Sequence, residues 1–357
     1  MLSLKQQIGQ MIVSGFEGTT LTTRTEDLIL QQGIGGLILF ERNYKNPDQL
    51  LKLINDLQSL NADNSEIPPL FISVDQEGGR VARLGEPFTQ FPHMSCLGQA
   101  DSNDLAYRFG LGMGKELRAV GINMDYAPVL DVHSNPENPI IGKRALDTDP
   151  EKVARLGTEL IRGFYDAGVI PVGKHFPGHG DTSQDSHLTL PRVDRTRESL
   201  EQCELIPFSH AIQQGLEVIM TAHVVYPAWD AHQPATFSPT IMNDVLRNSL
   251  QFEGLIMSDD LEMQAIDQKL ESISTLGIRA GIDLFLICHD LKKVSSFQNI
   301  MIQDIEAEKT PKSTIEQSLA RIFQVKEKLK ALEKTKSNFE NILSENKNLA
   351  QEMQAFL

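Results

Sequence analysis

The chain is short of cysteine and of basic residues. It has three cysteines among 357 residues, and 33 Lys and Arg against 48 Asp and Glu, for a formal net charge of −15. An odd, widely spaced set of cysteines is not a disulfide framework and indicates reduced thiols. The excess of negative charge repels polyanions, so we expect no nucleic-acid partner.

The start of the chain also lacks the features of a secretory signal. There is no basic region followed by a continuous apolar stretch and a small-residue cleavage site. No apolar run elsewhere reaches the ~18 residues that a membrane span needs. These absences predict a cytoplasmic protein with no membrane partner.

What is present is a regular alternation of two patterns. Short apolar runs occur at 10–15, 35–40, 69–75, 122–128, 169–175, 217–223, 254–260 and 282–288. Each is too short for a helix and is apolar on both faces, as a strand in a covered parallel sheet must be. Stretches of helical periodicity, such as 46–60, separate the runs. The alternation predicts a (β/α)₈ barrel, with a doubly wound open sheet as the alternative.

Polar side chains recur where these runs end, and this favours the barrel. They are Asp75, Asp125, Lys174, His175, His223 and Asp259. Any one of them can simply open a loop or cap the next helix. In a barrel, however, the carboxyl ends of all strands meet at one mouth, so these side chains become neighbours.

We expect a single barrel domain over residues 1–333 and a C-terminal helical extension over 334–357, packed on or next to the barrel. From about Thr310 onward, apolar residues recur at helical spacing among many Lys and Glu. This pattern predicts the closing helix of the barrel and one further helix. The charges there are typical of a solvated face.

The stretch KHFPGHGDTSQDSH, residues 174–187, concentrates polar chemistry in one loop. A metal site could use His175, His179, Asp185 and His187. Pro177 and Gly178 disfavour the helix that would pair His175 with His179 on one face, so we expect no metal. A metal-dependent barrel hydrolase stays as an alternative.

Within the same loop, Asp185 and His187 suit acid–base chemistry. A carboxylate two residues from an imidazole can hold one ring nitrogen and leave the other for a substrate. Asp259 is the first acidic group after the apolar run at 254–258, and Asp260 is placed to cap the following helix. A carboxylate and a proton donor at one mouth are the minimum for retaining glycoside hydrolysis, although an aldolase or an isomerase could use similar residues.

Five stretches together resemble a known family. They are SVDQEGGRVARL, NMDYAPVLDV, NPIIGKRAL, KHFPGHGDTSQDSHLTLP and GLIMSDDLEMQAI. The chain is similar to the bacterial β-N-acetylglucosaminidases of glycoside hydrolase family 3, the enzymes of peptidoglycan recycling. The resemblance runs in unbroken order from about Gln7 to Cys288 and so covers the whole expected barrel.

The resemblance implies a role for each candidate site residue. Asp259 would be the nucleophile and His187 the acid/base, with Asp185 as its partner. The residues implied to bind the N-acetylglucosamine before the cleaved bond are Asp75, Arg83, Arg144, Lys174 and His175. Arg80 and His223 are further candidates, for holding Asp75 or the nucleophile in place.

The activity implied is that of an exo-acting, retaining β-N-acetylglucosaminidase that needs no metal or cofactor. Its implied substrate is the N-acetylglucosaminyl-1,6-anhydromuramyl disaccharide, with or without peptide, and we expect a monomer. The chain is too short for the additional sandwich domain of many family members, which agrees with a loop histidine as acid/base. The alternatives are a β-glucosidase of the same family and a non-catalytic muropeptide sensor.

Overall fold

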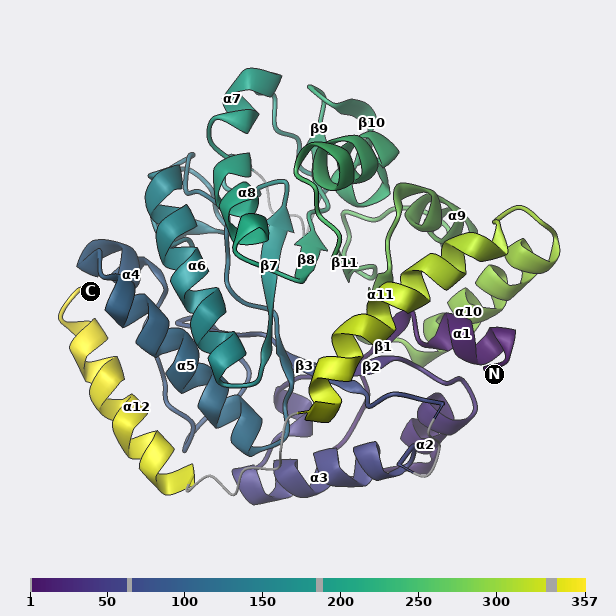
Figure 1. Ribbon diagram of the computed structural model, residues 1–357, viewed down its shortest axis with the longest axis horizontal. Helices are drawn as coiled ribbons and strands as arrows, with labels where there is room; N and C mark the ends of the chain where they lie inside the picture. Colours follow the sequence, from purple (N-terminus) through teal and green to yellow (C-terminus); the bar gives the residue numbers. More distant parts are fainter. Residues whose placement is uncertain (1, 63–65, 184–188, 332–338) are drawn as a thin grey trace.

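The fold is built on a closed parallel barrel (Figure 1). The computed structural model describes residues 2–62, 66–183, 189–331 and 339–357. Within these ranges eight strands close the barrel in the order β1-β12-β11-β8-β7-β6-β3-β2. They are β1 (Ile12–Ser14), β2 (Gly36–Leu39), β3 (Phe71–Val74), β6 (Met124–Asp125), β7 (Ile170–Phe176), β8 (Val218–Thr221), β11 (Leu255–Asp260) and β12 (Leu284–Ile287). The barrel prediction is confirmed, and the open sheet is excluded because β1 pairs with both β2 and β12.

Burial on both faces explains why the apolar runs became strands. Every residue of β2, β3, β8 and β12 is buried, with barrel side chains on one face and helices on the other. Two strands depart from regular pairing near their carboxyl ends. The register shifts between Gly173 and Phe176 in β7 and between Met257 and Asp260 in β11. Such irregularities re-aim side chains, and both occur where candidate site residues lie.

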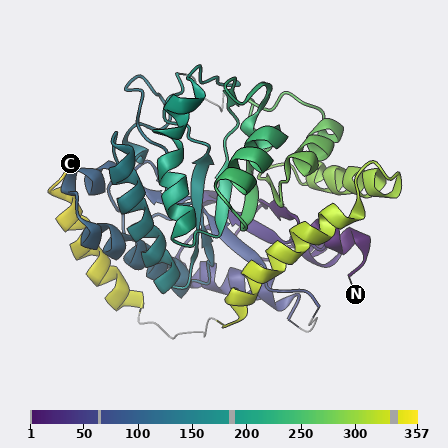
Figure 2. The same ribbon diagram turned by 45° about the horizontal axis from the view of Figure 1, so that its top comes forward.

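Helices surround the strands on the outside (Figure 2). They are α1 (Leu4–Gly9), α2 (Thr23–Leu30), α3 (Pro47–Ser59), α4 (Ser95–Ala100), α5 (Asn103–Ala119), α6 (Pro150–Asp166), α7 (Arg197–Glu201), α8 (Leu205–Gln213), α9 (Leu270–Ala280) and α10 (Leu291–Glu306), with the π-helix η4 (Thr240–Ser249) between β8 and β11. Local chemistry fixes their starts. In α3, the Asn46 side chain accepts a hydrogen bond from the Gln49 amide, and Pro47 occupies the first turn. None of the described helices is long and apolar enough to cross a membrane.

Short elements at the mouth add to this frame of strands and helices. A hairpin of β4 (Gln76–Gly78) and β5 (Val81–Ala82) follows β3, and a second of β9 (Val225–Tyr226) and β10 (Asp230–Pro234) follows β8. The 3₁₀ turns are η1 (Glu41–Asn43), η2 (Gly142–Arg144) and η3 (Ala235–Phe237). The sequence patterns did not predict the two hairpins, and the first of them carries a residue of the candidate site.

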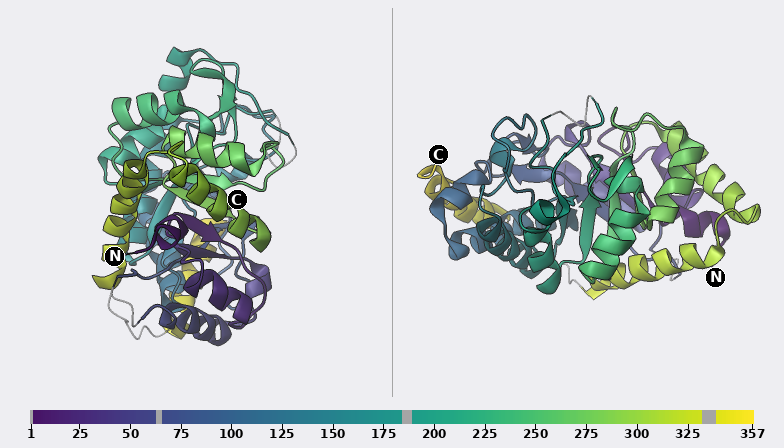
Figure 3. Two further views of the ribbon diagram at one scale, coloured as in Figure 1. Left: turned by 90° about the vertical axis from the view of Figure 1, so that its right-hand side faces the viewer. Right: turned by 90° about the horizontal axis from the view of Figure 1, so that it is seen from above.

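The chain ends in two long helices, α11 (Lys312–Ala331) and α12 (Phe339–Gln354). The Lys326 ammonium of α11 donates to the Gly35 carbonyl (2.7 Å), just before β2, so α11 crosses the amino ends of the strands. Helix α12 lies along α5, far from α1 at the other end of the longest axis (Figures 1 and 3). Asn346 donates to Gly112 O (2.8 Å), and a Cβ at Gly112 would lie 2.3 Å from the Asn346 side chain. Only glycine therefore allows this close approach of the two helices.

Candidate active site

The mouth of the barrel gathers candidate side chains from five different strands. Asp75 follows β3, Asp125 ends β6, Lys174 and His175 lie in β7, His223 follows β8, and Asp259 lies in β11. The Lys174 ammonium contacts Asp75 Oδ1 at 2.8 Å across the intervening strand β6. Side chains 99 positions apart in the sequence thus meet at the mouth, as the carboxyl ends of barrel strands should.

A network of five charged side chains, here called the ionic frame, lines this mouth. It consists of Asp75, Glu77, Arg83, Arg144 and Lys174. The Arg144 guanidinium donates to both carboxylate oxygens of Glu77, at 2.9 and 2.8 Å. The Lys174 ammonium lies 2.6 Å from Glu77 Oε1, and Arg83 lies more loosely 3.7 Å from Asp75 Oδ2. The bidentate contact fixes the plane of Arg144 as well as its position.

Glu77 is the centre of the ionic frame, and its role was not predicted. Its side chain is only 1% exposed, and that of Lys174 only 2%. Burial by itself raises the pKa of Glu77, but the charges of Arg144 and Lys174 outweigh it and hold the pKa far below its usual range. Burial lowers the pKa of Lys174, yet Asp75 and Glu77 raise it above the ordinary value. Glu77, Arg144 and Lys174 are therefore all charged at neutral pH.

Asp125 is the exception among the acidic groups at the mouth. It is fully buried, and burial raises its pKa well above the ordinary value, with the charges of Asp75 and Glu77 acting in the same direction. Its Oδ1 accepts the Gln76 amide at 3.0 Å, while Oδ2 has no hydrogen-bond partner among the described residues. Burial therefore favours the neutral form of Asp125 beside the ionic frame.

A second buried carboxylate, Asp131, anchors the start of the histidine-rich loop. Its Oδ2 accepts from the His175 ring at Nδ1 (2.7 Å), and its Oδ1 accepts the backbone amides of His175 (3.0 Å) and His179 (2.7 Å). Burial raises the pKa of Asp131, but His175 outweighs this and lowers it.

The sequence contained a signal for Asp131 that was not used. It stands in the apolar run APVLDV, and a carboxylate at such a position needs a partner when it is buried. Glu77 offered no comparable signal, because it stands in the polar stretch DQEGGR. Its only mark was membership of a stretch that resembled the family.

The described part of the loop packs against the segment that follows β6. A Cβ at Gly180 would lie 1.5 Å from the Val132 carbonyl, so the backbone contact requires glycine. Asn138 donates to His179 O (2.8 Å), and the His179 ring at Nδ1 pairs with Thr182 Oγ1 (2.9 Å). Burial, with His175 nearby, lowers the pKa of His179 to about 4, so this ring is neutral at pH 7.

Two predicted residues of the loop, Asp185 and His187, lie outside the described residues. Their proposed roles therefore rest on the sequence alone. In the part of the chain that is described, no three His, Cys, Asp or Glu side chains form a group that could hold a metal ion.

Asp259 has the environment of an ionised carboxylate. It is half-buried, and its Oδ1 accepts the Asp260 amide at 2.8 Å. Burial alone raises the pKa of Asp259, but His223, His175, the Asp260 N–H and Lys174 lower it below its ordinary value. A charged oxygen at this place can act as a nucleophile or stabilise a cation.

The two further candidates hold backbone rather than carboxylates. His223 pairs with Thr236 Oγ1 through Nδ1 (2.8 Å) and donates from Nε2 to the Asp260 carbonyl (3.1 Å). It therefore supports the strand beside Asp259 instead of bonding the carboxylate itself. Arg80 donates to the Ile140 carbonyl, and the structure does not bring it to Asp75.

Asp260 does not cap a helix, contrary to expectation. The next helix, α9, begins only at Leu270. Asp260 Oδ1 instead accepts the amides of Glu262 (3.1 Å) and Cys288 (3.3 Å), so it ties the end of β11 to the end of β12. Burial and the neighbouring Asp259 raise its pKa to about 7.

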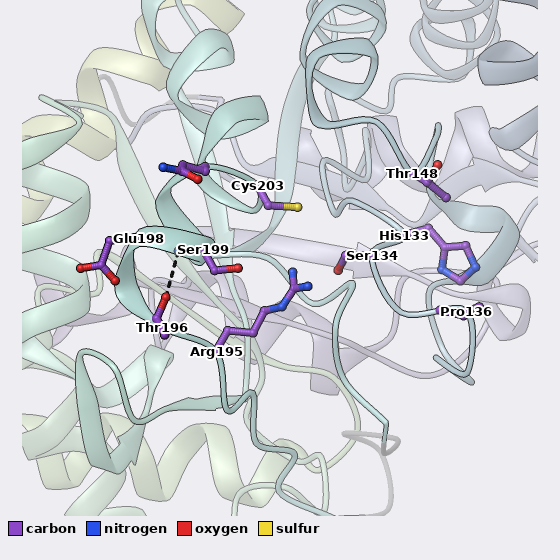
Figure 4. A pocket seen from close by; sticks show the side chains of 10 residues that line it. His133, Ser134, Pro136, Thr148, Arg195, Thr196, Glu198, Ser199 and Cys203 are labelled. Atoms are coloured by element: carbon purple, nitrogen blue, oxygen red, sulfur yellow. Dashed lines mark hydrogen bonds between the residues drawn. The ribbon is translucent and has the colours of Figure 1, made fainter.

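A pocket of about 740 Å³ lies beside the site and has a different lining (Figure 4). It opens between the segment of His133, Ser134 and Thr148 and the segment from Arg195 to Cys203. Neither Asp259 nor any member of the ionic frame lines it. It is therefore distinct from the candidate site and does not contain the charged groups suited to the chemistry.

The comparisons with known proteins agree with the barrel and with the five stretches. The profile described as "Glycosyl hydrolase family 3 N terminal domain" matches residues 3–325. The chain belongs to glycoside hydrolase family 3. Among curated relatives, it is 37% identical over 335 residues to "Beta-hexosaminidase A" of Pseudoalteromonas piscicida, covering 87% of this chain and 56% of that protein. It is 41% identical over 286 residues to "Beta-hexosaminidase" of Alkalilimnicola ehrlichii, covering 78% and 80%.

Solved structures of this family superpose closely on the chain. A family 3 β-N-acetylglucosaminidase from Paenibacillus sp. str. FPU-7 has a TM-score of 0.94 at 38% identity, over 100% of this chain and 69% of that one. NagZ from Neisseria gonorrhoeae, in complex with N-trifluoroacetyl-D-glucosamine, has a TM-score of 0.77 at 31% identity, over 95% and 98%. This family 3 chain thus spans about half the length of the Pseudoalteromonas relative and nearly the whole of the Neisseria protein.

Proposed function

We propose that the protein is a retaining, exo-acting β-N-acetylglucosaminidase. The observation that carries the proposal is that an ionised Asp259 and the ionic frame lie at the same mouth of the barrel. A retaining glycosidase requires a nucleophile and an acid/base; Asp259 fits the first role, and His187 is proposed for the second. The names of the relatives, beta-hexosaminidase and β-N-acetylglucosaminidase, support the choice of sugar.

In the proposed mechanism Asp259 attacks the anomeric carbon of the terminal sugar. The glycosidic C–O bond breaks, and His187, held by Asp185, protonates the leaving oxygen. The neutral His187 then takes a proton from water, and the water oxygen displaces Asp259 from the anomeric carbon. Retention follows because the carbon is attacked twice, from opposite faces.

The ionic frame is proposed to bind the sugar hydroxyls. Lys174 has three N–H groups and contacts two carboxylates, which leaves one donor for a ligand. Asp75 offers acceptor oxygens, and the loosely held Arg83 can reorient toward a ligand. With Arg144 and His175, these are the five binding residues that the resemblance implies.

The natural substrate proposed is the N-acetylglucosaminyl-1,6-anhydromuramyl disaccharide, with or without peptide. A cytoplasmic monomer completes the proposal. The three free cysteines are compatible with a reducing compartment. Cell fractionation and light scattering test these two points separately from the activity.

Trapping the intermediate is the direct test. A 2-acetamido-5-fluoro glycoside should label the enzyme, and peptide mass mapping should find the label on Asp259. Asp259→Ala should lose at least ~10³-fold in kcat, as expected when a covalent nucleophile is removed. A label on another carboxylate would overturn the assignment.

Three comparisons separate the alternatives. Faster turnover of an aryl glucoside than of an aryl N-acetylglucosaminide would favour a β-glucosidase. Loss of activity on treatment with a chelator, restored by a divalent metal, would favour a metal-dependent hydrolase. A folded protein that binds N-acetylglucosamine but never turns over would favour a sensor.

A further inference from the structure

The amino end of the barrel, opposite the mouth, carries a cavity of about 290 Å³. It lies between η4, the end of α9 and the start of α11. The Arg247 guanidinium in its wall donates to the carbonyls of Phe252 (2.9 Å) and Gly254 (2.6 Å), just before β11 begins. Asp259 stands five residues further along the strand, about 16 Å away. The cavity is therefore separate from the candidate active site.

Cationic side chains dominate this cavity. Its lining includes Arg247, Arg279, Lys309 and Arg321. In the part of the chain that is described, their carboxylate contacts are Asp283, shared by Arg247 (2.8 Å) and Arg321 (3.0 Å), and Asp304, which pairs with Lys309 (3.1 Å). Four cations thus share two carboxylates, in a chain whose formal net charge is −15.

Arg247 is a fixed wall of the cavity rather than a free ligand group. Its donors are taken by two carbonyls and by Asp283. Burial and the neighbouring Arg321 charge lower the pKa of Arg247 to about 10, although Asp283 opposes them. The four cations outnumber the two carboxylates that pair with them, so the cavity carries an excess of positive charge.

The remaining cations can reach a ligand. Arg279 is exposed, and no hydrogen bond or ion pair of its guanidinium occurs among residues 2–62, 66–183, 189–331 and 339–357. Arg279 and Arg247 lie in the last turns of α9 and η4, where a helix dipole favours a cation. That effect does not account for Lys309 and Arg321, which converge on the same cavity from the other side.

Neutral donors complete the lining. Thr310 and Thr314 bring hydroxyl groups, and Asn243 brings an amide. A cavity of about 290 Å³ is at the small end of ligand sites and suits a compact anion. Guanidinium groups match the oxygens of a phosphate in geometry as well as in charge.

We propose that this cavity binds a phosphate group, either as inorganic phosphate or as the phosphomonoester of a small sugar. The proposal is independent of the glycosidase function, because it concerns binding at the other end of the barrel. It makes Arg279, Lys309 and Arg321 the ligand-contacting cations and Arg247 their support.

The test is calorimetric titration of the full chain at low ionic strength with inorganic phosphate and with glucose 6-phosphate. The first two variants below lie at the cavity only, so they distinguish binding there from binding at the mouth. Arg279→Glu changes an exposed side chain, so folding should be retained; Lys309→Glu also breaks the pair with Asp304, so its free energy of unfolding is measured as well. Each should weaken binding at least about tenfold, because a charge-assisted hydrogen bond is replaced by repulsion. Arg24→Glu, at an exposed arginine in α2, is the matched control for net charge.

The outcomes are distinct. Tighter binding of glucose 6-phosphate than of phosphate means that the sugar part also occupies the cavity, and equal affinity means that phosphate alone is recognised. Either result, with the loss confined to Arg279→Glu and Lys309→Glu, supports the proposal. It is overturned if neither probe binds at millimolar concentration, or if Arg24→Glu weakens binding as much as the cavity variants do.

Discussion

Replacing Glu77 by Gln tests whether the ionic frame positions the sugar-binding cations. The substitution keeps size and shape and removes one charge. Arg144 then faces an amide N–H₂ in place of one of the two oxygens at 2.8 and 2.9 Å. Lys174 keeps its contact with Asp75 at 2.8 Å but loses the charge 2.6 Å away at Glu77.

The magnitude follows from burial. Removing one partner of a buried ion pair costs about 3–5 kcal/mol, and the surviving Asp75 contact places this case near about 3 kcal/mol. Two cations that lose their fixed positions by about 1 Å should lower kcat/KM about a hundredfold. The assays are urea denaturation for the free energy of unfolding and hydrolysis of an aryl N-acetylglucosaminide for kcat/KM.

Glu116→Gln is the matched control, because Glu116 is equally buried but has neutral partners. Its carboxylate accepts from the Thr89 amide (2.9 Å) and from Asn346 (2.7 Å) on α12. We expect Glu116→Gln to lower stability and leave kcat/KM near the wild-type value. If Glu77→Gln loses stability but retains wild-type kcat/KM, the ionic frame does not position the catalytic site and the reasoning is wrong.

Three further predictions concern the loop and its supports. Asp131→Asn presents His175 Nδ1 with an amide that can donate, so kcat/KM should fall about tenfold or more and its pH profile should shift, as measured with the aryl substrate. His187→Ala should slow substrates with poor leaving groups far more than an activated nitrophenol, and equal losses would contradict the acid/base role. Glu204, directly before α8, lies against the loop, since a Cβ at Gly178 would lie 2.7 Å from its side chain. Burial raises the pKa of Glu204 to about 7. The folded state therefore holds this proton more tightly than the unfolded state, and the free energy of unfolding falls as pH rises from about 4.5 to 7. The free energy of unfolding of Glu204→Gln, relative to that of the wild type, should therefore be higher at pH 8 than at pH 5 by up to about 3 kcal/mol in urea denaturation. The same relative value at both pH values would refute this.

The barrel could be predicted from the sequence because its strands are buried on both faces. A strand such as β12, Leu284–Ile287, then has to be apolar at every position, and the pattern stands out. The β4–β5 hairpin could not be found in this way. It is only a few residues long and includes the polar residues Gln76 and Glu77, whose burial depends on partners from distant segments.

The same contrast holds for the candidate site. Asp75, Lys174, His175 and Asp259 end strands, so the geometry of a barrel is enough to bring them together. Arg80 donates to the Ile140 carbonyl, 60 positions away, and Asp260 ties the ends of two strands, because each bonds the donor or acceptor that neighbouring segments bring near it. Such contacts depend on the paths of the loops, and the periodicity of strands and helices does not encode those paths.

The charge at the mouth depends on which carboxyl groups stay ionised, and the strand order explains the result. β6 lies between β3 and β7, so Asp125 stands between the strands that bring Asp75 and Lys174 together. Burial raises the pKa of Asp125 and so favours its neutral form, and Lys174 pairs with Asp75 and Glu77. Two carboxylates then face Lys174, Arg144 and Arg83, and Asp259 is kept ionised by His223 and His175 first, then by the Asp260 N–H and Lys174.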